Sequence, residues 1–208
     1  MKIAVSILNC PVPEDEIIAK INESNADAFH VDINDGKFLP VPKNEYKFLH
    51  TATKPLNVHL MVSDPFEYIS YFASLKADEI IFNVELDENI DELLDYIKSK
   101  GIKCGLAIKP ETSVSSIKKY LSKLDAVLIL SIIPGKSGQP MIISTLDKID
   151  ELKELRRANG YNYDIIIDGG INDTTIELIR KKGADMIVSG SFIWKSEDIQ
   201  AQIDKLRG

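Results

Sequence analysis

Residues 164–170 read DIIIDGG, and this stretch indicates the fold better than any other. Its apolar part is short, continuous and β-branched, which is typical of a strand buried on both faces of a parallel sheet. Amphipathic segments that we expect to be helices flank it at residues 144–158 and 173–182. The stretch therefore predicts a strand between two helices, with an acid and two glycines where the strand ends.

Seven other runs share this character, being short and rich in Val and Ile. The eight predicted strands cover residues 3–8, 28–33, 56–61, 79–84, 102–108, 126–131, 164–167 and 185–188. Most of them alternate with predicted helices. These helices begin near residues 13 and 65 and cover residues 88–100, 113–121, 144–158, 173–182 and 196–206, with a short one at 44–50.

Eight strands alternating with helices predict an α/β fold, a single (β/α)8 barrel of the TIM type that spans residues 1–208 as one domain. An open, doubly wound sheet is the structural alternative. The residues after the first strand, Asn9-Cys10-Pro11, lack the glycine-rich fingerprint of dinucleotide-binding folds, which weakens this alternative. We find no clear sequence repeat among the eight units.

Composition limits the partners that the chain can have. Hydrophobic residues make up 44% of it, so a sizeable core is feasible. Its 25 Lys and Arg against 32 Asp and Glu give a formal net charge of −7. We therefore expect neither nucleic acid held by a general basic surface nor a polybasic membrane anchor. An anionic small molecule remains possible, because a local site can be positive on an acidic protein.

Two features favour a cytoplasmic location. No run approaches the roughly 18 apolar residues of a membrane-spanning helix, and the first apolar run is too short for a signal peptide. Cys10 and Cys104 lie far apart and form no CxxC motif. A disulfide framework is therefore not expected, which favours a reducing compartment.

Polar residues stand at the ends of three predicted strands, where functional groups collect in such a barrel. They are His30 and Asp32, His59, and Asp168. His30 and Asp32 are two residues apart on a strand, so their side chains point to the same side. Two imidazoles and two carboxylates at one barrel mouth predict a divalent metal site, for zinc before iron, manganese or cobalt. The alternative is that hydrogen bonds satisfy each polar group separately.

Glycines follow the last three predicted strands, at residues 134–139, 168–170 and 189–191. Glycine lets backbone N–H groups approach an anion closely, and the loops after strands seven and eight often bind phosphate in these barrels. We expect a phosphate mainly on Gly170, Gly190 and Ser191, with Gly138 assisting. Ordinary turn formation explains any one of these stretches equally well.

Asp32 and Asp168 are the predicted acid–base pair. Their strands would place them on different sides of the barrel mouth, facing each other across a bound sugar. Two such carboxylates suit removal of a proton on one face and its return on the other. A metal would stabilise the enediolate formed between the two steps. Structural pairing of the two acids is the alternative.

Four short blocks occur in order along the chain. They are HVD at residues 30–32, VHLM at 58–61, PGxxGQ at 134–139 and DGG at 168–170, preceded by SIL at 6–8 and followed by GS at 190–191. With these blocks the chain resembles the ribulose-phosphate 3-epimerase family over nearly its whole length. Any one block is weak evidence, but the ordered set is specific.

This resemblance implies an isomerase of the pentose phosphate pathway that interconverts D-ribulose 5-phosphate and D-xylulose 5-phosphate at C3, and a homo-oligomer. It implies that His30, Asp32, His59 and Asp168 hold a metal and that the two aspartates exchange acid and base roles with direction. The implied substrate-binding residues are Ser6, His59, Met61, Gly138, Gly170, Gly190 and Ser191.

The chain departs from the family pattern at several positions. The family usually has Met where Asn34 and Leu130 stand, and often His at Asn83. Lys136 and Ser137 replace the usual Phe and small residue of the glycine-rich loop, where the lysine would either meet the phosphate or point to solvent. The altered positions put the shape of the substrate cavity in question.

These departures keep other functions open. The second βα connection, at residues 37–55, is shorter than in the family, and residues 52–56 and 138–140 are also similar to the allulose-6-phosphate 3-epimerase branch. A 3-epimerase of a hexulose 6-phosphate such as D-allulose 6-phosphate is therefore the first alternative. A non-catalytic pseudoenzyme that binds a sugar phosphate is the second. The intact set of four metal ligands stands against it.

Overall fold

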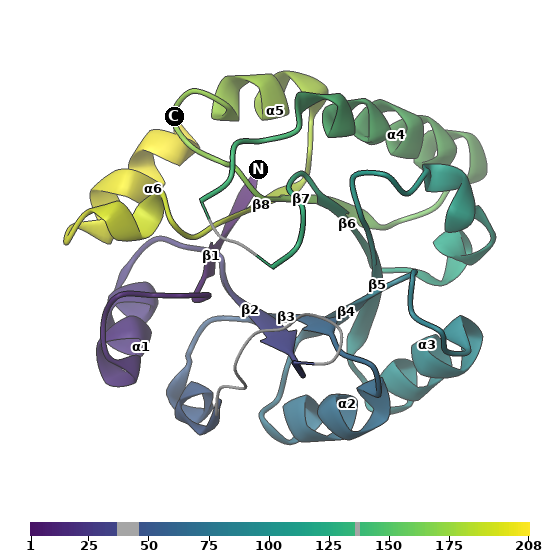
Figure 1. The fold of residues 1–208 in the computed structure, drawn as a ribbon, viewed down its shortest axis with the longest axis horizontal. Helices are drawn as coiled ribbons and strands as arrows, with labels where there is room; N and C mark the ends of the chain where they lie inside the picture. The colour runs from purple at the N-terminus through teal and green to yellow at the C-terminus, as the bar shows by residue number, and fades with distance from the viewer. Residues whose placement is uncertain (37–45, 136–137) are drawn as a thin grey trace.

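The structure is a computed structural model that describes residues 1–36, 46–135 and 138–208. Eight parallel strands close into a barrel in the order of the sequence, and β8 pairs with β1 (Figure 1). The predicted (β/α)8 barrel is confirmed. The strands are β1 (Lys2–Ser6), β2 (Ala28–Asn34), β3 (Leu56–Met61), β4 (Glu79–Asn83), β5 (Lys103–Ile108), β6 (Ala126–Leu130), β7 (Asp164–Asp168) and β8 (Met186–Ser189).

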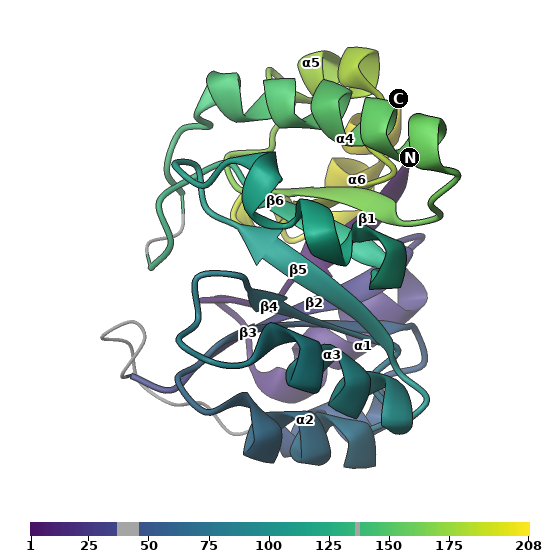
Figure 2. The same ribbon diagram turned by 90° about the vertical axis from the view of Figure 1, so that its right-hand side faces the viewer.

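Helices surround the barrel, with α2 and α3 on one side of it and α4 and α5 on the opposite side (Figure 2). The helices are α1 (Glu14–Glu23), α2 (Pro65–Ser74), α3 (Ile90–Ser99), α4 (Asp147–Asn159), α5 (Ile176–Lys182) and α6 (Ile199–Arg207). Short 3-10 helices supplement them: η1 (Lys47–Thr51), η2 (Val114–Ser116), η3 (Lys118–Lys123), η4 (Ile143–Leu146) and η5 (Ile193–Lys195).

The helix predicted at residues 113–121 is wrong, because the segment forms η2 and η3 instead. Serines explain the difference. Ser116 Oγ donates to the carbonyl of Ser113 at 2.8 Å, and the Ser113 and Ser115 hydroxyls bond each other at 2.6 Å. Such local bonds compete with the α-helical pattern. The short helix predicted at 44–50 is η1, shifted to Lys47–Thr51, and residues 44–45 lie outside the described part.

The start of α5 also differs from the prediction. The helix begins at Ile176 rather than at residue 173. Asn172 Oδ1 accepts hydrogen bonds from the backbone N–H of Thr174 at 2.8 Å and of Thr175 at 3.2 Å. This side chain therefore builds a turn before the helix, as asparagine commonly does.

Side chains alternate along each strand between the barrel interior and the layer under the helices. Most apolar core residues lie in the layer between strands and helices. A smaller apolar cluster fills the barrel interior from Ala4, Ala28, Ile81, Ala107, Ala126, Leu128, Leu130, Ile166, Met186 and Val188. Most interior positions of β2 and β3 instead carry buried polar residues, and this asymmetry marks where the site is built.

A repeated contact braces the N-terminal end of the barrel. An aspartate directly before each even-numbered strand accepts the backbone N–H at the first or second residue of the preceding odd-numbered strand. The pairs are Asp27 with Ile3 at 2.8 Å, Asp78 with Leu56 at 2.9 Å, Asp125 with Cys104 at 2.9 Å and Asp185 with Ile165 at 2.8 Å. In each pair the backbone N–H of the aspartate donates back to the same partner's carbonyl. Sequence analysis missed this structural repeat.

Candidate active site

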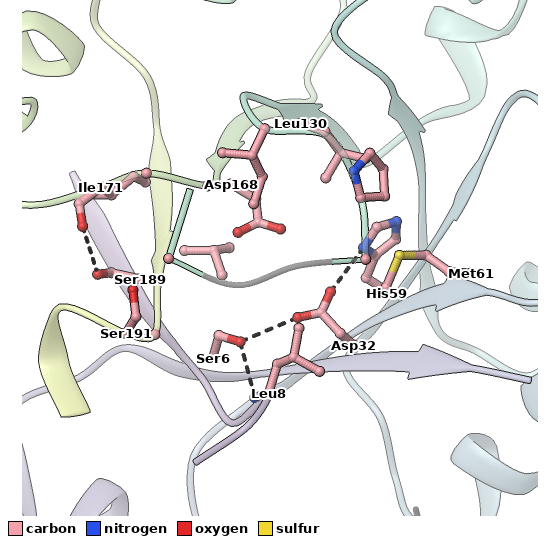
Figure 3. A pocket seen from close by; sticks show the side chains of 18 residues that line it. Ser6, Leu8, Asp32, His59, Met61, Leu130, Asp168, Ile171, Ser189 and Ser191 are labelled. Atoms are coloured by element: carbon pink, nitrogen blue, oxygen red, sulfur yellow. Dashed lines mark hydrogen bonds and ion pairs between the residues drawn. The ribbon is translucent and has the colours of Figure 1, made fainter. Parts of the chain in front are cut away.

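A cavity lies at the C-terminal end of the strands, where the sequence predicts the functional groups (Figure 3). The side chains of Asp32 and Asp168 come from opposite walls, β2 and β7, and point into it. Nine of the predicted site residues line it: Ser6, Asp32, His59, Met61, Gly138, Asp168, Gly170, Gly190 and Ser191. His30 lies behind Asp32 and is fully buried.

Strand register brings the histidines and Asp32 together. His30 and Asp32 occupy successive interior positions of β2, and Asp32 stands beside His59 of β3. Asp32 Oδ1 lies 3.3 Å from His30 Nε2 and 3.1 Å from His59 Nδ1. Because the pairing of β2 with β3 fixes this register, the three side chains meet without help from a loop.

His30, Asp32, His59 and Asp168 each offer one ligand atom, and these atoms all lie within 4.8 Å of one another. Ligands around a tetrahedral zinc at bonds of about 2.0–2.1 Å are about 3.3 Å apart. The two contacts of Asp32 Oδ1 already have this spacing. Two imidazole nitrogens with two carboxylate oxygens also form a donor set that zinc and other divalent transition metals accept. The group therefore fits a divalent cation.

Two asparagines hold the outer nitrogens of the imidazoles. His30 Nδ1 lies 2.7 Å from Asn57 Oδ1, and His59 Nε2 lies 2.9 Å from Asn83 Oδ1. A carbonyl oxygen only accepts, so each ring donates its outer N–H and turns the other nitrogen toward Asp32. Ligating histidines are commonly oriented in this way. Sequence analysis missed Asn57 and noted Asn83 only as a departure.

Burial and charge push the two carboxyl groups apart in pKa. Burial alone would raise the pKa of Asp32, but its contacts with His30 and His59 lower it well below the usual range. Burial and the charge of Asp32 raise the pKa of Asp168 to about 6, against the opposing effect of the histidines. Burial lowers the pKa of His30, yet Asp32 outweighs it and raises the value to about 9. One acid is thus held ionised, while the other still carries a proton up to about pH 6.

Ser6 and Ser131 fix the positions of the two acids. Ser6 Oγ donates to Asp32 Oδ2 at 3.3 Å and accepts the backbone N–H of Leu8 at 3.2 Å (Figure 3). Ser131 Oγ lies 2.7 Å from the carbonyl oxygen of Asp168 and 2.6 Å from that of Gly169. The hydroxyls therefore act on different parts of the acids, the side chain of one and the backbone of the other.

The glycines predicted to bind phosphate converge on the same cavity. Gly170 has a φ of +65°, and a Cβ there would lie 2.4 Å from the backbone nitrogen of Met141, so no larger residue fits without a shift. A Cβ at Gly190 would lie 3.2 Å from Cβ of Ser6. Gly138 also lines the cavity, with a φ of +74°. Lys136 and Ser137, whose role the sequence left open, lie outside the described residues.

The ordered sequence blocks agree with a comparison to known proteins. A model of the ribulose-phosphate 3 epimerase family matches residues 2–194. Ribulose-phosphate 3-epimerase of Escherichia coli (strain K12) is 35% identical over 211 residues, which cover 99% of this chain and 94% of that protein. The chain belongs to the ribulose-phosphate 3 epimerase family. The family member of Aquifex aeolicus (strain VF5) is 37% identical over 186 residues, covering 88% and 84% of the two chains.

Solved structures show how widely the fold is shared. Tryptophan synthase of Mycobacterium tuberculosis matches with a TM-score of 0.73 over 99% of this chain and 90% of that chain, at 10% identity. At such low identity the likeness shows the barrel alone, because one fold supports many activities.

Among the described residues, no helix combines the length and the apolar character needed to cross a membrane.

Proposed function

We propose that the chain is a ketose-phosphate 3-epimerase that interconverts D-ribulose 5-phosphate and D-xylulose 5-phosphate. The family and its named members support this isomerase activity. The observation that carries the proposal is the pair Asp32 and Asp168, whose side chains face one cavity from opposite walls. A proton removed from one face of C3 and returned to the other inverts that carbon.

The two acids have suitable protonation states for this exchange. Asp32 is held ionised and can accept the C3 proton, while Asp168, with a pKa of about 6, can hold a proton and deliver it to the opposite face. In the reverse direction their roles exchange.

His30, Asp32, His59 and Asp168 would hold a divalent cation, with zinc favoured over iron, manganese or cobalt by the nitrogen and oxygen donors. When bound, such a cation stabilises negative charge that develops on the substrate oxygens. Ser6, His59 and Met61 line the same cavity and would contact the sugar. The backbone at Gly138, Gly170, Gly190 and Ser191 would bind the phosphate through N–H groups.

Deuterium incorporation at C3 tests this function. The purified chain is incubated in D2O with D-ribulose 5-phosphate and, separately, with D-allulose 6-phosphate, with and without a chelator. We expect chelator-sensitive exchange and epimerisation of the pentulose phosphate. Exchange only on the hexulose phosphate would assign the chain to that substrate. No exchange on either substrate, with metal bound, would contradict the activity and favour a sugar-phosphate-binding protein.

Leu130 is the observation that favours the alternative substrate, a hexulose phosphate. It lines the cavity beside Asp168, where the resemblance predicts a methionine. A shorter side chain there would leave more space for a longer sugar. A cytoplasmic location and a homo-oligomer remain predictions from the sequence, and light scattering of the purified chain would test the second.

A further inference from the structure

Two hydrogen-bonded chains of the same composition run outward from the two histidines. Each consists of a histidine, an asparagine and a glutamate. In the first, Asn57 Oδ1 contacts His30 Nδ1 at 2.7 Å, and Asn57 Nδ2 donates to Glu79. The second repeats this order with His59, Asn83 and Glu85.

In this second chain, Asn83 Oδ1 contacts His59 Nε2 at 2.9 Å, and Asn83 Nδ2 donates to Glu85 Oε2 at 3.0 Å. Both asparagines are buried, with 3% and 0% of their surface exposed. Buried amides of this kind keep both of their hydrogen-bonding ends satisfied. The two chains therefore have the same direction, from imidazole to amide to carboxylate.

A carboxylate gives an amide a definite orientation. The contacts of Glu85 lower its pKa and keep it ionised, whereas Glu79, with a pKa of about 7, is ionised above neutral pH. An ionised glutamate only accepts, so it takes the amide N–H and leaves the amide carbonyl facing the imidazole. The imidazole must then donate its outer N–H. As a result His30 presents Nε2 and His59 presents Nδ1 to Asp32 Oδ1, at 3.3 and 3.1 Å. Without the glutamate, the amide could turn over and place its N–H against the ring.

The two glutamates lie at opposite ends of the barrel. Glu85 accepts the backbone N–H of Lys109 at 3.0 Å and the hydroxyl of Thr112, which lowers its pKa despite burial. Lys148 Nζ donates to the carbonyls of Lys109 at 2.7 Å and Thr112 at 2.7 Å, holding the same turn. Glu79 starts β4 beside Asn57, with Lys103 at the start of the neighbouring β5.

We propose that Glu79 and Glu85 are positioning residues, which act through Asn57 and Asn83 to fix the ring orientation and tautomer of His30 and His59 and so set the affinity for the divalent cation. This inference rests on the metal site of the proposed function. It assigns a role to Asn83, at which the chain departs from the family pattern. Groups that orient ligating histidines typically change metal affinity about 10–100-fold when removed.

Metal affinity of the full chain gives the first test, by zinc titration in competition with a chromophoric chelator. Glu79→Ala should weaken zinc binding about 10–100-fold. Glu79→Gln, which still accepts the Asn57 N–H through its amide carbonyl, should keep most of the affinity. Asp164→Ala is the matched control, because Asp164 also begins a strand at this end of the barrel but pairs with Lys2 at 2.8 Å. It should bind zinc as the wild type does.

Histidine tautomers give a second test that needs no activity. The chain has 3 histidines, so long-range nitrogen–proton NMR spectra are simple to assign. In the zinc-loaded wild type we expect the proton of His30 on Nδ1 and that of His59 on Nε2. In Glu79→Ala the His30 signals should shift or broaden while those of His59 stay in place. Glu85→Ala should have the opposite effect.

The outcomes separate this inference from the proposed function. If the wild type binds zinc and epimerises its substrate, but Glu79→Ala and Glu85→Ala keep its affinity and its histidine signals, the glutamates do not position the ligands. If the wild type instead carries the proton of His30 on Nε2 and that of His59 on Nδ1, the inference is wrong. This measurement does not depend on whether a variant folds. If the wild type binds no divalent cation, both the inference and the metal assignment fall.

Discussion

Aspartates occupy both ends of the barrel, but their neighbours differ. At the N-terminal end, Asp27, Asp78, Asp125 and Asp185 each accept a backbone N–H at 2.8–2.9 Å, and ion pairs with Arg207 and Arg156 supplement two of them. At the C-terminal end, Asp32 and Asp168 face histidines and each other across a cavity. The same side chain therefore braces strands at one end and is available for chemistry at the other.

The difference arises from what the surroundings require of the charge. A carboxylate that accepts a backbone N–H stabilises the folded chain through that bond. Asp32 is instead buried and the half-buried Asp168 lies close to it, so their pKa values are driven apart. Such a pair is typical of functional sites. We therefore expect substitutions of the C-terminal aspartates mainly to lower activity. Substitutions of the N-terminal aspartates should mainly lower stability.

Asp168→Asn should give the largest effect on activity. An amide keeps the shape of the side chain but neither holds nor releases the proton, so turnover should fall about 10²–10⁴-fold. The free energy of unfolding should change little or rise, because burial disfavours the ionised acid. Measurement of epimerisation and of urea unfolding checks both. Turnover at the wild-type level would remove Asp168 from the acid–base pair.

Asp125→Ala should show the converse. The change leaves the backbone N–H of Cys104 without its partner and should lower the free energy of unfolding by about 1–3 kcal/mol. Turnover per folded molecule should stay near the wild-type value. Asp125→Asn keeps an acceptor and should lose less stability. A large loss of turnover in Asp125→Ala at full folding would break the division between the two ends.

Glu79 lies at the N-terminal end of the barrel but is linked through Asn57 to His30 in the site. The pH dependence of stability therefore tests how this buried carboxyl differs from the aspartates around it. Burial raises its pKa from 4.5 to about 7. The folded chain then holds this proton more tightly than the unfolded chain, so ionisation destabilises the fold as the pH rises from 4.5 to about 7. Glutamine does not titrate. The stability advantage of Glu79→Gln over wild type should therefore grow by on the order of 1–3 kcal/mol across this window.

Urea unfolding of both proteins at several pH values between 4.5 and 8 measures this difference. Asp91→Asn serves as the control, because Asp91 is an exposed carboxyl of α3 that pairs with Lys123 and is not among the groups that shift the pKa of Glu79. A constant difference between Glu79→Gln and wild type at all pH values would show that the Glu79 carboxyl does not titrate in this range.

Sequence reasoning reached the strands and the four proposed ligands because both depend on local patterns. Runs such as DIIID are typical of buried, β-branched strands. His30 and Asp32 are two positions apart, which places them on one side of a strand. It missed Asn57 and Glu79, because their meaning depends on register. His30 stands beside Asn57, and Asn57 beside Glu79, only once β2, β3 and β4 are paired. A polar residue in a strand gives no such signal alone.

The repeat at the N-terminal end was missed for a related reason. It consists of a single aspartate before each even-numbered strand, usually after an alanine, as in Ala77-Asp78 and Ala184-Asp185. Two residues recurring at unequal intervals do not stand out from the background of an acidic chain. The hydrogen bonds to the preceding strands give them their common role, and these require the closed barrel.

Ser6→Ala should give the smallest effect, although Ser6 lies in the active cavity. Its hydroxyl donates to Asp32 Oδ2 over a long 3.3 Å, while Asp32 Oδ1 keeps its contacts with both histidines. We expect kcat/KM to fall by less than about 10-fold, which corresponds to about 1.4 kcal/mol, with little change in unfolding. Ser131→Ala should cost more activity, since Ser131 holds the backbone on which Asp168 is carried, at 2.7 Å. If Ser6→Ala lowered kcat as far as Asp168→Asn without changing KM, weaker sugar binding would not explain the loss, and the acid–base machinery would extend beyond the two aspartates.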